Sequence, residues 1–294
     1  MAEYRTVAIV GVGLIGGSIG RALRERGLAQ EVVGIGRRET SLATAQKVGA
    51  FDWGTLDLAD GVKRAELVVI ATPVATVVDS VVAVARASAR SLITDAGSTK
   101  AEICHLVRKR AADESRSFDT RFIGSHPLAG DHRTGPEFAR PDLLEGRTVV
   151  ITPEDDTFAE LVGRIRTFWQ SLGARVVEMT PQAHDQALAT TSHLPHLVAS
   201  ALAAATPKHW LELTATGWAD ATRIASGDAM LWSQIFTQNR AAMLDSLEGF
   251  EASLNELKDA LQRGDTAQLI NRLQEAKERR DALGDRHSSG PESA

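Results

Sequence analysis

Cysteine, aromatic residues and long apolar runs are all scarce in this chain of 294 residues. The one cysteine, Cys104, can form no disulfide within the chain and can supply no thiolate cage for a metal, so nothing points to an oxidising compartment. No segment reaches the roughly 18 continuous apolar residues that a membrane-spanning helix needs. The glycine-rich apolar stretch 7–20 also lacks the basic leader of a signal peptide. We therefore expect a cytoplasmic protein.

An excess of basic charge is missing as well. The chain carries 33 Lys and Arg against 38 Asp and Glu, for a formal net charge of −5. It therefore lacks the wide basic surface that binds phosphate backbones, and nucleic acid is not expected as a partner. The length of 294 residues predicts about two domains with a sizeable core.

Two kinds of hydrophobic pattern divide the chain near residue 178. Before it, apolar runs of strand length alternate with helical stretches, which is typical of βαβ units in a parallel sheet. These runs are 6–10, 32–35, 67–71, 92–94, 121–124, 148–151 and 175–178. After them only helical patterns follow. We predict a doubly wound, mostly parallel α/β domain over 1–178, an all-helical substrate and dimerisation domain over 179–284, and a disordered tail over 285–294.

The helical part carries its own start and stop signals. Thr180 before Pro181 predicts a helix N-terminus. The helix that follows, about 182–206, contains Pro195, which removes a backbone hydrogen bond and should kink it. Later helices are expected near 232–261 and 267–282, where apolar residues recur at three- and four-residue steps. Their apolar faces would pack together or pair two copies of the chain.

A glycine triplet directly follows the first predicted strand. Gly11 permits a tight turn, Gly13 lets the backbone approach a pyrophosphate, and Gly16 lets the next helix pack closely on the strand. The N-terminus of that helix, at Leu14 and Ile15, would face the phosphates. Between a strand and a helix this spacing predicts a Rossmann-like dinucleotide site. A glycine-rich turn without a ligand is the alternative.

The end of the second predicted strand bears on which dinucleotide binds. NAD-selective sites place an Asp or Glu there, about twenty residues past the glycines, to bind the ribose 2′-hydroxyl. Here the position is Gly36, followed by Arg37 and Arg38, which can hold a 2′-phosphate, so we predict NADP over NAD. The alternative is that both arginines are solvated loop charges. Thr72 and Pro73, which follow the third predicted strand, are assigned to the same cofactor site.

A nicotinamide enzyme that oxidises an alcohol needs a base at the carboxyl edge of the sheet. His126, which follows a predicted strand and precedes a proline, is the candidate. Ser98, which follows another predicted strand, would hydrogen-bond a substrate hydroxyl or orient His126. Next to it, Thr99 and Glu102 match a capping box for the helix that begins there.

Three histidines lie in the first helix of the later half. His193 and His196 flank Pro195, and the kink would aim one or both into a cleft between the domains; burial in the core is the alternative. His184 lies nine residues before His193, which is two and a half α-helical turns and sets the two on opposite faces. A three-histidine metal site is therefore not expected.

An acid and a base lie three residues apart further on. Asp220 and Arg223 would share one helical face. They form either an exposed ion pair of little energetic value or a clamp in which Asp220 holds the Arg223 guanidinium against a substrate carboxylate. Trp232 either walls the same pocket or belongs to the core.

Five of these segments, in this order and spacing, resemble the prephenate/arogenate dehydrogenases of tyrosine biosynthesis. Each segment alone is weakly specific, whereas five in order are strongly so. The resemblance extends from about residue 6 to 283. The segments are GVGLIGGS at 11–18, DAGSTK at 95–100, GSHP at 124–127, SHLPH at 192–196, and TRIA at 222–225 followed by Trp232.

The resemblance implies oxidative decarboxylation of a cyclohexadienol to a 4-hydroxyphenyl product, with hydride passing to the nicotinamide and without a metal. It implies that His126 takes the ring-hydroxyl proton, that Ser98 assists it, that Arg223 binds the ring carboxylate, and that His196 lies near the substrate side chain. It also implies a homodimer formed through the helical domain. Because the length leaves no room for a fused mutase or a separate regulatory domain, we expect a monofunctional enzyme.

Two other classes of function remain open. A different two-domain dehydrogenase, acting on a β-hydroxyacid or an imine, would use a lysine or another donor on a helix rather than a histidine at a strand end. A dinucleotide sensor would need no base, so His126, Ser98 and Arg223 together argue against it. The sequence leaves open whether the substrate is prephenate or arogenate, whether the cofactor is NAD or NADP, and whether tyrosine inhibits.

Overall fold

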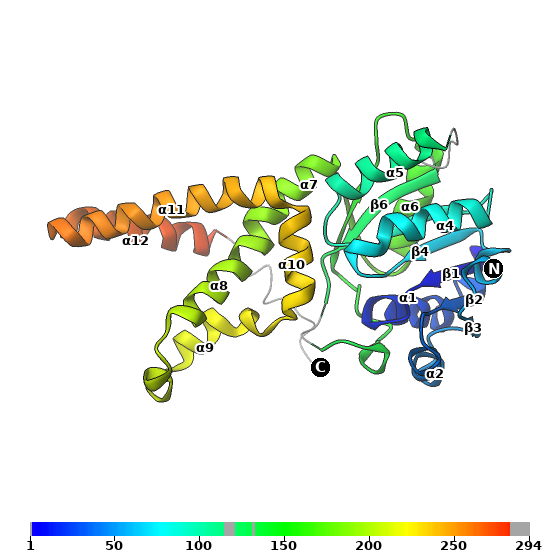
Figure 1. The fold of residues 1–294 in the computed structure, drawn as a ribbon, viewed down its shortest axis with the longest axis horizontal. Coiled ribbons are helices and arrows are strands. Elements are labelled where there is room, and N and C mark those ends of the chain that lie inside the picture. The colour runs from blue at the N-terminus through cyan, green and yellow to red at the C-terminus, as the bar shows by residue number, and fades with distance from the viewer. Residues whose placement is uncertain (1, 115–120, 131–132, 283–294) are drawn as a thin grey trace. The chain divides into compact units, whose positions relative to one another are not determined.

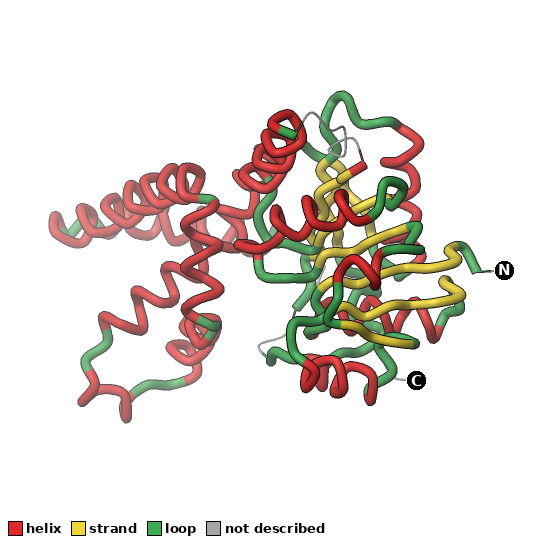
Figure 2. Tube along the Cα trace, turned by 45° about the vertical axis from the view of Figure 1, so that its right-hand side comes forward, coloured by secondary structure: helices red, strands yellow, loops and turns green. Residues whose placement is uncertain are grey.

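We describe residues 2–114, 121–130 and 133–282 of a computed structural model of the chain. Within these residues eight strands form one sheet (Figures 1 and 2). The strands are β1 (Tyr4–Val10), β2 (Ala29–Ile35), β3 (Trp53–Thr55), β4 (Leu67–Ile70), β5 (Leu92–Asp95), β6 (Phe122–Pro127), β7 (Thr148–Thr152) and β8 (Arg175–Glu178). Their order is β3-β2-β1-β4-β5-β6-β7-β8, and every neighbouring pair is parallel except β6 with β7. The predicted doubly wound, mostly parallel sheet is confirmed.

Helices cover both faces of this sheet, because alternate residues of each strand point to opposite sides. In β1, Val7 and Ile9 belong to one apolar core, which includes residues of α1, α2 and α6. Ala8 and Val10 belong to the other, with residues of α3, α4 and α5. These helices are α1 (Leu14–Glu25), α2 (Glu39–Lys47), α3 (Leu58–Val62), α4 (Val77–Ala87), α5 (Ala101–Asp113) and α6 (Ala159–Ser171).

Strand β3 is the one strand of the described sheet that the sequence pattern missed. It has only three residues, and its sequence Trp-Gly-Thr shows no apolar run. It forms through its parallel pairing with β2, in which Val33 lies opposite Trp53. The Trp53 indole also donates a hydrogen bond of 3.0 Å to Glu31. Tertiary pairing therefore decides this strand, and local propensity does not.

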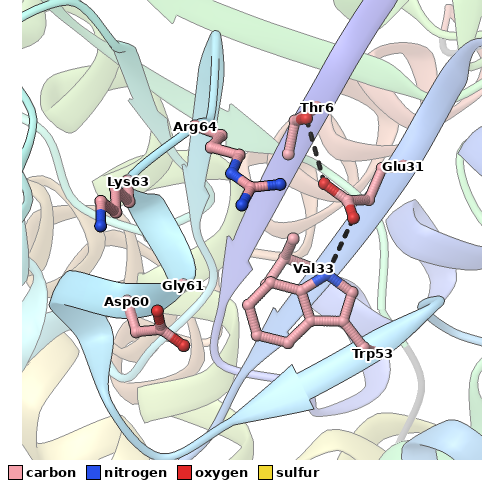
Figure 3. A pocket seen from close by; sticks show the side chains of 8 residues that line it. All are labelled: Thr6, Glu31, Val33, Trp53, Asp60, Gly61, Lys63 and Arg64. Carbon is pink, nitrogen blue, oxygen red and sulfur yellow. Dashed lines mark hydrogen bonds between the residues drawn. The ribbon is translucent and has the colours of Figure 1, made fainter.

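A hollow of about 310 Å³ lies beside the first residues of these strands (Figure 3). Thr6 and Trp53 line it, and the Glu31 carboxylate accepts a hydrogen bond from each of them. Ligands of doubly wound sheets bind outside the opposite, carboxyl ends of the strands, where the strand order reverses. In this sheet the reversal lies between β1 and β4. The hollow is therefore away from the edge where the candidate site is expected.

The later part of the described chain is helical, as predicted. The Thr180 hydroxyl accepts a hydrogen bond of 3.2 Å from the Ala183 N–H, so the helix begins where the sequence indicates. A π-helical turn, η4, precedes Pro195, which lacks an N–H; such turns are one recognised cause of a helix kink. The segments are α7 (Pro181–Leu188), η4 (Ala189–His193), α8 (Leu194–Ala205), η5 (Lys208–Leu213), α9 (Thr216–Thr222), η6 (Arg223–Ser226), α10 (Ala229–Gln238), α11 (Arg240–Arg263) and α12 (Thr266–Asp281). Two short 3-10 segments, η1 (Val74–Thr76) and η3 (Pro136–Phe138), lie earlier in the chain.

The prediction of one helix near 232–261 is wrong in one respect, because the structure has two helices there, α10 and α11, separated at Asn239. This residue ends α10, and its side chain donates a 2.7 Å hydrogen bond to the backbone carbonyl of Asp185.

The chain forms two compact units, Met1–Met243 and Leu244–Ala294. The domain boundary predicted near 178 remains a prediction, and the tail predicted over 285–294 lies outside the described residues. Of the described helices, none is long and apolar enough to cross a membrane.

Candidate active site

The turn after β1 has the geometry that a close approach to a ligand requires. Gly11 has a φ of +96°, and a Cβ at this position would lie 2.6 Å from the carbonyl oxygen of Ala71. A Cβ at Gly16 would lie 2.0 Å from the carbonyl oxygen of Gly11, so α1 packs against the strand end at a glycine. At Gly13, by contrast, a Cβ would meet nothing within 4 Å. The space over the Gly13 backbone is therefore open.

The residues around this turn fit a dinucleotide. Gly13 is the N-cap of α1 and provides no side-chain cap, so the first N–H groups of the helix remain available to an anion. The Thr72 methyl group lies beside the turn at Gly11, and the Thr72 hydroxyl is buried and has no hydrogen-bond partner in the described part of the chain. Arg37 and Arg38, which follow β2, are exposed, as is Pro73 after β4.

Alanine at two of the glycines should separate folding from cofactor binding. Gly13→Ala should leave stability unchanged and weaken cofactor binding by about tenfold or more, because its methyl group fills the space that a pyrophosphate would take. Gly11→Ala should lower the free energy of unfolding by about 2–4 kcal/mol, because of its positive φ and the contact with Ala71. Denaturation and cofactor titration followed by tryptophan fluorescence measure both effects. Gly163→Ala, on α6 with open space around it, is the control, and unchanged cofactor affinity in Gly13→Ala would contradict the assignment.

A row of two histidines and a carboxylate lies at the end of β6. His126 Nδ1 is 2.8 Å from His184 Nε2, and His184 Nδ1 is 2.7 Å from Asp185 Oδ1. His184 is fully buried, and Asp185 is 3% exposed. The antiparallel pairing of β6 with β7 sets His126 opposite Val150. The strand end thus positions His126, and α7 supplies its two partners.

Asp185 also binds the first turn of α5. Its Oδ1 accepts a hydrogen bond from Lys100 N at 2.8 Å, and its Oδ2 accepts one from Ala101 N at 2.9 Å. The capping box predicted for this helix is wrong, since the Thr99 hydroxyl instead donates to Gln238 Oε1 at 2.6 Å. A carboxylate from another helix satisfies the N–H groups that a local cap would have taken.

A buried ion pair lies next to this row. The Lys100 ammonium contacts Asp95 Oδ2, and both side chains are fully buried. The Asp95 carboxylate also accepts hydrogen bonds from Gly97 N and Ser125 N, each at 2.9 Å. Through Asp95, the ion pair ties the ends of β5 and β6 together. Neither residue was predicted as a site residue from the sequence.

Both histidines of the row are held neutral near neutral pH. Burial lowers the pKa of His126 well below its ordinary value, and the positive charge of Lys100 acts in the same direction. Burial also lowers the pKa of His184, although its hydrogen bond to Asp185 opposes the shift. A neutral imidazole has one bare nitrogen, so His126 can accept a proton.

His193 and His196 occupy two different environments. His193 is 1% exposed, its Nδ1 is 3.1 Å from Asn239 Nδ2, and burial lowers its pKa to about 4. His196 stacks on Trp232 with ring centroids 3.6 Å apart and an angle of 16° between the planes. The Trp232 ring therefore contacts His196, and the sequence assigns both residues to the substrate site.

Three candidates from the sequence make fewer contacts than expected. Ser98 is half-buried, and its hydroxyl bonds no described residue, so the hydrogen bond that orients His126 comes from His184. No ion pair joins Asp220 to Arg223 in the described chain, and both are exposed. Helix α9 ends at Thr222 and continues as a 3-10 turn from Arg223, so the α-helical spacing that the pairing assumed is lost.

The contact of His184 with His126 was not predicted from the sequence. The nine-residue spacing sets His184 and His193 on opposite faces of one continuous α-helix, whereas the π-helical turn η4 interrupts that helix between the two residues. Asn239 bonds both the Asp185 carbonyl and His193, so α7 and η4 contribute to one cluster. The acid that directly follows His184 in the sequence, Asp185, was the signal from which a hydrogen-bonded histidine could have been predicted. Among the described residues, no three His, Cys, Asp or Glu side chains form a group that could hold a metal ion.

Comparison with known proteins identifies the family. The profile described as "Prephenate dehydrogenase, nucleotide-binding domain" matches residues 19–178, and the one described as "Prephenate dehydrogenase, dimerization domain" matches residues 180–275. The chain belongs to the prephenate dehydrogenase family. The resemblance seen in the sequence is thereby confirmed.

Individual members of the prephenate dehydrogenase family match nearly the whole chain. A cyclohexadienyl dehydrogenase of Zymomonas mobilis is 30% identical, over 99% of this chain and 100% of its own length. The prephenate dehydrogenase of Bacillus subtilis is 31% identical, over 95% of this chain and 76% of its own. The crystal structure of an A. aeolicus prephenate dehydrogenase in complex with hydroxyphenyl propionate and NAD+ is 31% identical, with a TM-score of 0.87, and covers 95% of this chain and 98% of that one.

Proposed function

We propose that this chain oxidises and decarboxylates a cyclohexadienol that carries a ring carboxylate, either prephenate or arogenate, with NAD(P) as hydride acceptor. The observation that carries the proposal is the His126 imidazole at the end of β6, which is bound through Nδ1 to His184, in a member of the prephenate dehydrogenase family. The dinucleotide turn after β1 lies at the same carboxyl edge of the sheet.

In this mechanism His126 takes the ring-hydroxyl proton through its bare nitrogen. A nicotinamide held at the turn after β1 would supply the acceptor for the hydride on the carbon that carries this hydroxyl. In the resulting dienone the carboxylate is vinylogous to the ring carbonyl, so the electrons of the breaking C–C bond flow through a ring double bond to the carbonyl oxygen and carbon dioxide leaves. His126 then returns its proton to the oxygen, which gives the phenol. Ser98, half-buried beside Thr99, assists at the same oxygen.

Arg223 is assigned to the ring carboxylate, because its exposed guanidinium has no ion-pair partner in the described chain. Arg223→Ala should raise the Michaelis constant for the cyclohexadienol by about tenfold to a hundredfold and change kcat by less than about threefold. Initial rates over a range of substrate concentrations give both constants. Lys208→Ala, which removes one exposed positive charge from the same helical part, is the control. A loss confined to kcat would contradict this role.

Around the same substrate we place His193, His196 and Trp232, with Asp220 at its edge.

The cofactor preference is assigned to Arg37 and Arg38. Gly36 stands where an acid would select NAD, and both exposed guanidinium groups are free to hold a 2′-phosphate. Arg37→Ala combined with Arg38→Ala should weaken NADP binding by about tenfold to a hundredfold and change NAD binding by less than about twofold. Titration of each cofactor measures this, with Arg90→Ala, another exposed arginine, as the control. Equal losses for NAD and NADP would refute the assignment.

We also propose a homodimer formed through the helical part. The match to a dimerization domain over residues 180–275 supports it, and so do the exposed apolar side chains of α11 and α12. These include Leu254 and Leu261 on α11, and Ile270 and Leu273 on α12. The same match supports a change of domain near residue 179, as the sequence pattern predicts.

The stoichiometry of carbon dioxide tests the reaction class. Substrate labelled with ¹³C in the ring carboxylate should release one labelled carbon dioxide for each nicotinamide reduced. A dehydrogenase acting on a β-hydroxyacid or an imine would release none from this substrate, and a dinucleotide sensor would reduce no nicotinamide. Reduction without labelled carbon dioxide would therefore refute the proposed reaction.

A further inference from the structure

The hydrogen bonds of the histidine row determine where its protons lie. Asp185 is a carboxylate, which only accepts, so His184 Nδ1 carries a proton and donates it. A neutral His184 then has a bare Nε2, and the 2.8 Å contact with His126 requires that His126 Nδ1 donates. A neutral His126 that donates from Nδ1 keeps its lone pair on Nε2. One chain of donors and acceptors therefore sets both tautomers.

We propose that His184 and Asp185 are positioning residues that hold His126 in the tautomer whose Nε2 can accept the substrate proton. This inference rests on the proposed function only for the identity of the proton donor. Neither residue need touch the substrate. They act through His126, by fixing its ring orientation and its tautomer.

The position of Asp185 is fixed from several directions. Its two carboxylate oxygens accept from the N–H groups of Lys100 and Ala101 as well as from His184. Its backbone carbonyl accepts from Asn239 Nδ2. A carboxylate at a helix N-terminus is stabilised by the helix dipole as well as by these bonds. The acceptor that orients His184 is therefore held by α5 and by the residue that ends α10.

The same row can stabilise the charge that develops on His126. When Nε2 of His126 takes the proton, the O–H bond of the substrate breaks and an N–H bond forms, which leaves an imidazolium. Its Nδ1–H still donates to His184, whose own Nδ1–H donates to the Asp185 carboxylate. The positive charge is thus linked to the negative one through a neutral ring. The arrangement needs no displacement of any of the three side chains.

A purely structural role for the pair is the competing explanation. Asp185 caps α5, so its loss would lower stability whatever happens at His126. Replacement of His184 separates the two roles, because it leaves Asp185 and its bonds to the α5 backbone in place. Leucine at 184 has similar volume and no acceptor. Glutamine can accept from His126 and donate to Asp185.

The first measurement uses the unsubstituted protein and no substrate. The ¹⁵N chemical shifts of the His126 ring, assigned by comparison with a His126→Ala sample, should show a protonated Nδ1 and a bare Nε2 at pH 7.5. In His184→Leu the same ring should show a mixture of tautomers, and in His184→Gln the original pattern. A bare Nδ1 in the unsubstituted protein would overturn the inference. This readout is independent of turnover, so it stands even where the proposed reaction fails.

The second measurement is the steady-state rate of nicotinamide reduction. His184→Leu should lower kcat by about tenfold to a hundredfold, with both Michaelis constants changed by less than about threefold, and His184→Gln should recover most of the loss. Thermal unfolding of both variants shows whether they are folded. Equal kcat values in folded His184→Leu and unsubstituted protein would overturn the inference. Loss of turnover in every sample, with the tautomer as expected, would instead refute the proposed substrate.

Discussion

Replacement of His126 by alanine is expected to lower kcat by about 10²–10⁴-fold, the usual contribution of a positioned general base. The physical reason is that water at this half-buried position would be a much weaker base than an imidazole whose Nδ1 is bound to His184 at 2.8 Å. Cofactor binding should not change, because the turn after β1 does not depend on this side chain. Stopped-flow or steady-state rates, together with a cofactor titration, measure both quantities.

His105→Ala is the matched control for this variant, because His105 is an exposed histidine on α5. It should leave kcat within about twofold of the unsubstituted value, as surface substitutions usually do. The assignment of His126 as base would be wrong if its alanine variant kept more than about a tenth of the rate.

The pH profile gives a second test of the same residue. His126 acts as a base only when it is neutral, and its pKa is lowered well below its ordinary value by burial and by neighbouring positive charge. The active form therefore persists as the pH falls through about 6.5, the ordinary value. The acidic limb of kcat/KM should lie below that pH. An acidic limb at or above it would contradict a desolvated base.

The largest expected loss of stability follows from Lys100→Met. Both members of the Asp95–Lys100 pair are fully buried, so removal of the ammonium leaves a carboxylate without its cation. Breaking such a pair costs about 3–5 kcal/mol of unfolding free energy. Only two backbone N–H groups, of Gly97 and Ser125, would still bond the Asp95 carboxylate. Chemical denaturation at pH 7.5 measures the change.

Two further variants separate charge from packing. Asp95→Asn combined with Lys100→Met removes both charges. It should recover about half or more of the unfolding free energy that Lys100→Met loses, because no buried charge is left without a partner. Lys109→Met, on the exposed side of α5, should change stability by less than about 0.5 kcal/mol. If Lys100→Met were as stable as Lys109→Met, the buried pair would have no structural role.

Much of the fold was predictable from local patterns. The strands β1, β2 and β4 are apolar runs, and the turn after β1 needs glycine for reasons of backbone geometry alone. Such features are encoded within a few neighbouring residues, so a single sequence reveals them. The same holds for the helix N-terminus at Thr180. It also holds for the placement of His126 at a strand end.

Contacts between distant segments were not predictable in the same way. Asp185 caps α5 from 84 residues away, and Asn239 reaches the Asp185 carbonyl over 54 residues. The local signals at these places were misleading, since Thr99 matches a capping box but bonds Gln238. The π-helical turn η4 also interrupts the helix between His184 and His193, so the residue spacing of a continuous α-helix does not apply there. Tertiary contacts override local preference at the candidate site, which is where such conflicts are expected.

The most direct test of the proposed function is the initial rate of nicotinamide reduction at 340 nm, with prephenate and arogenate each offered with NAD and with NADP. We expect reduction with at least one of the two substrates, and a higher rate with NADP because of Arg37 and Arg38. The substrate that reacts identifies the ring side chain. Absence of reduction in all four combinations, by folded protein that binds the cofactor, would contradict the central claim.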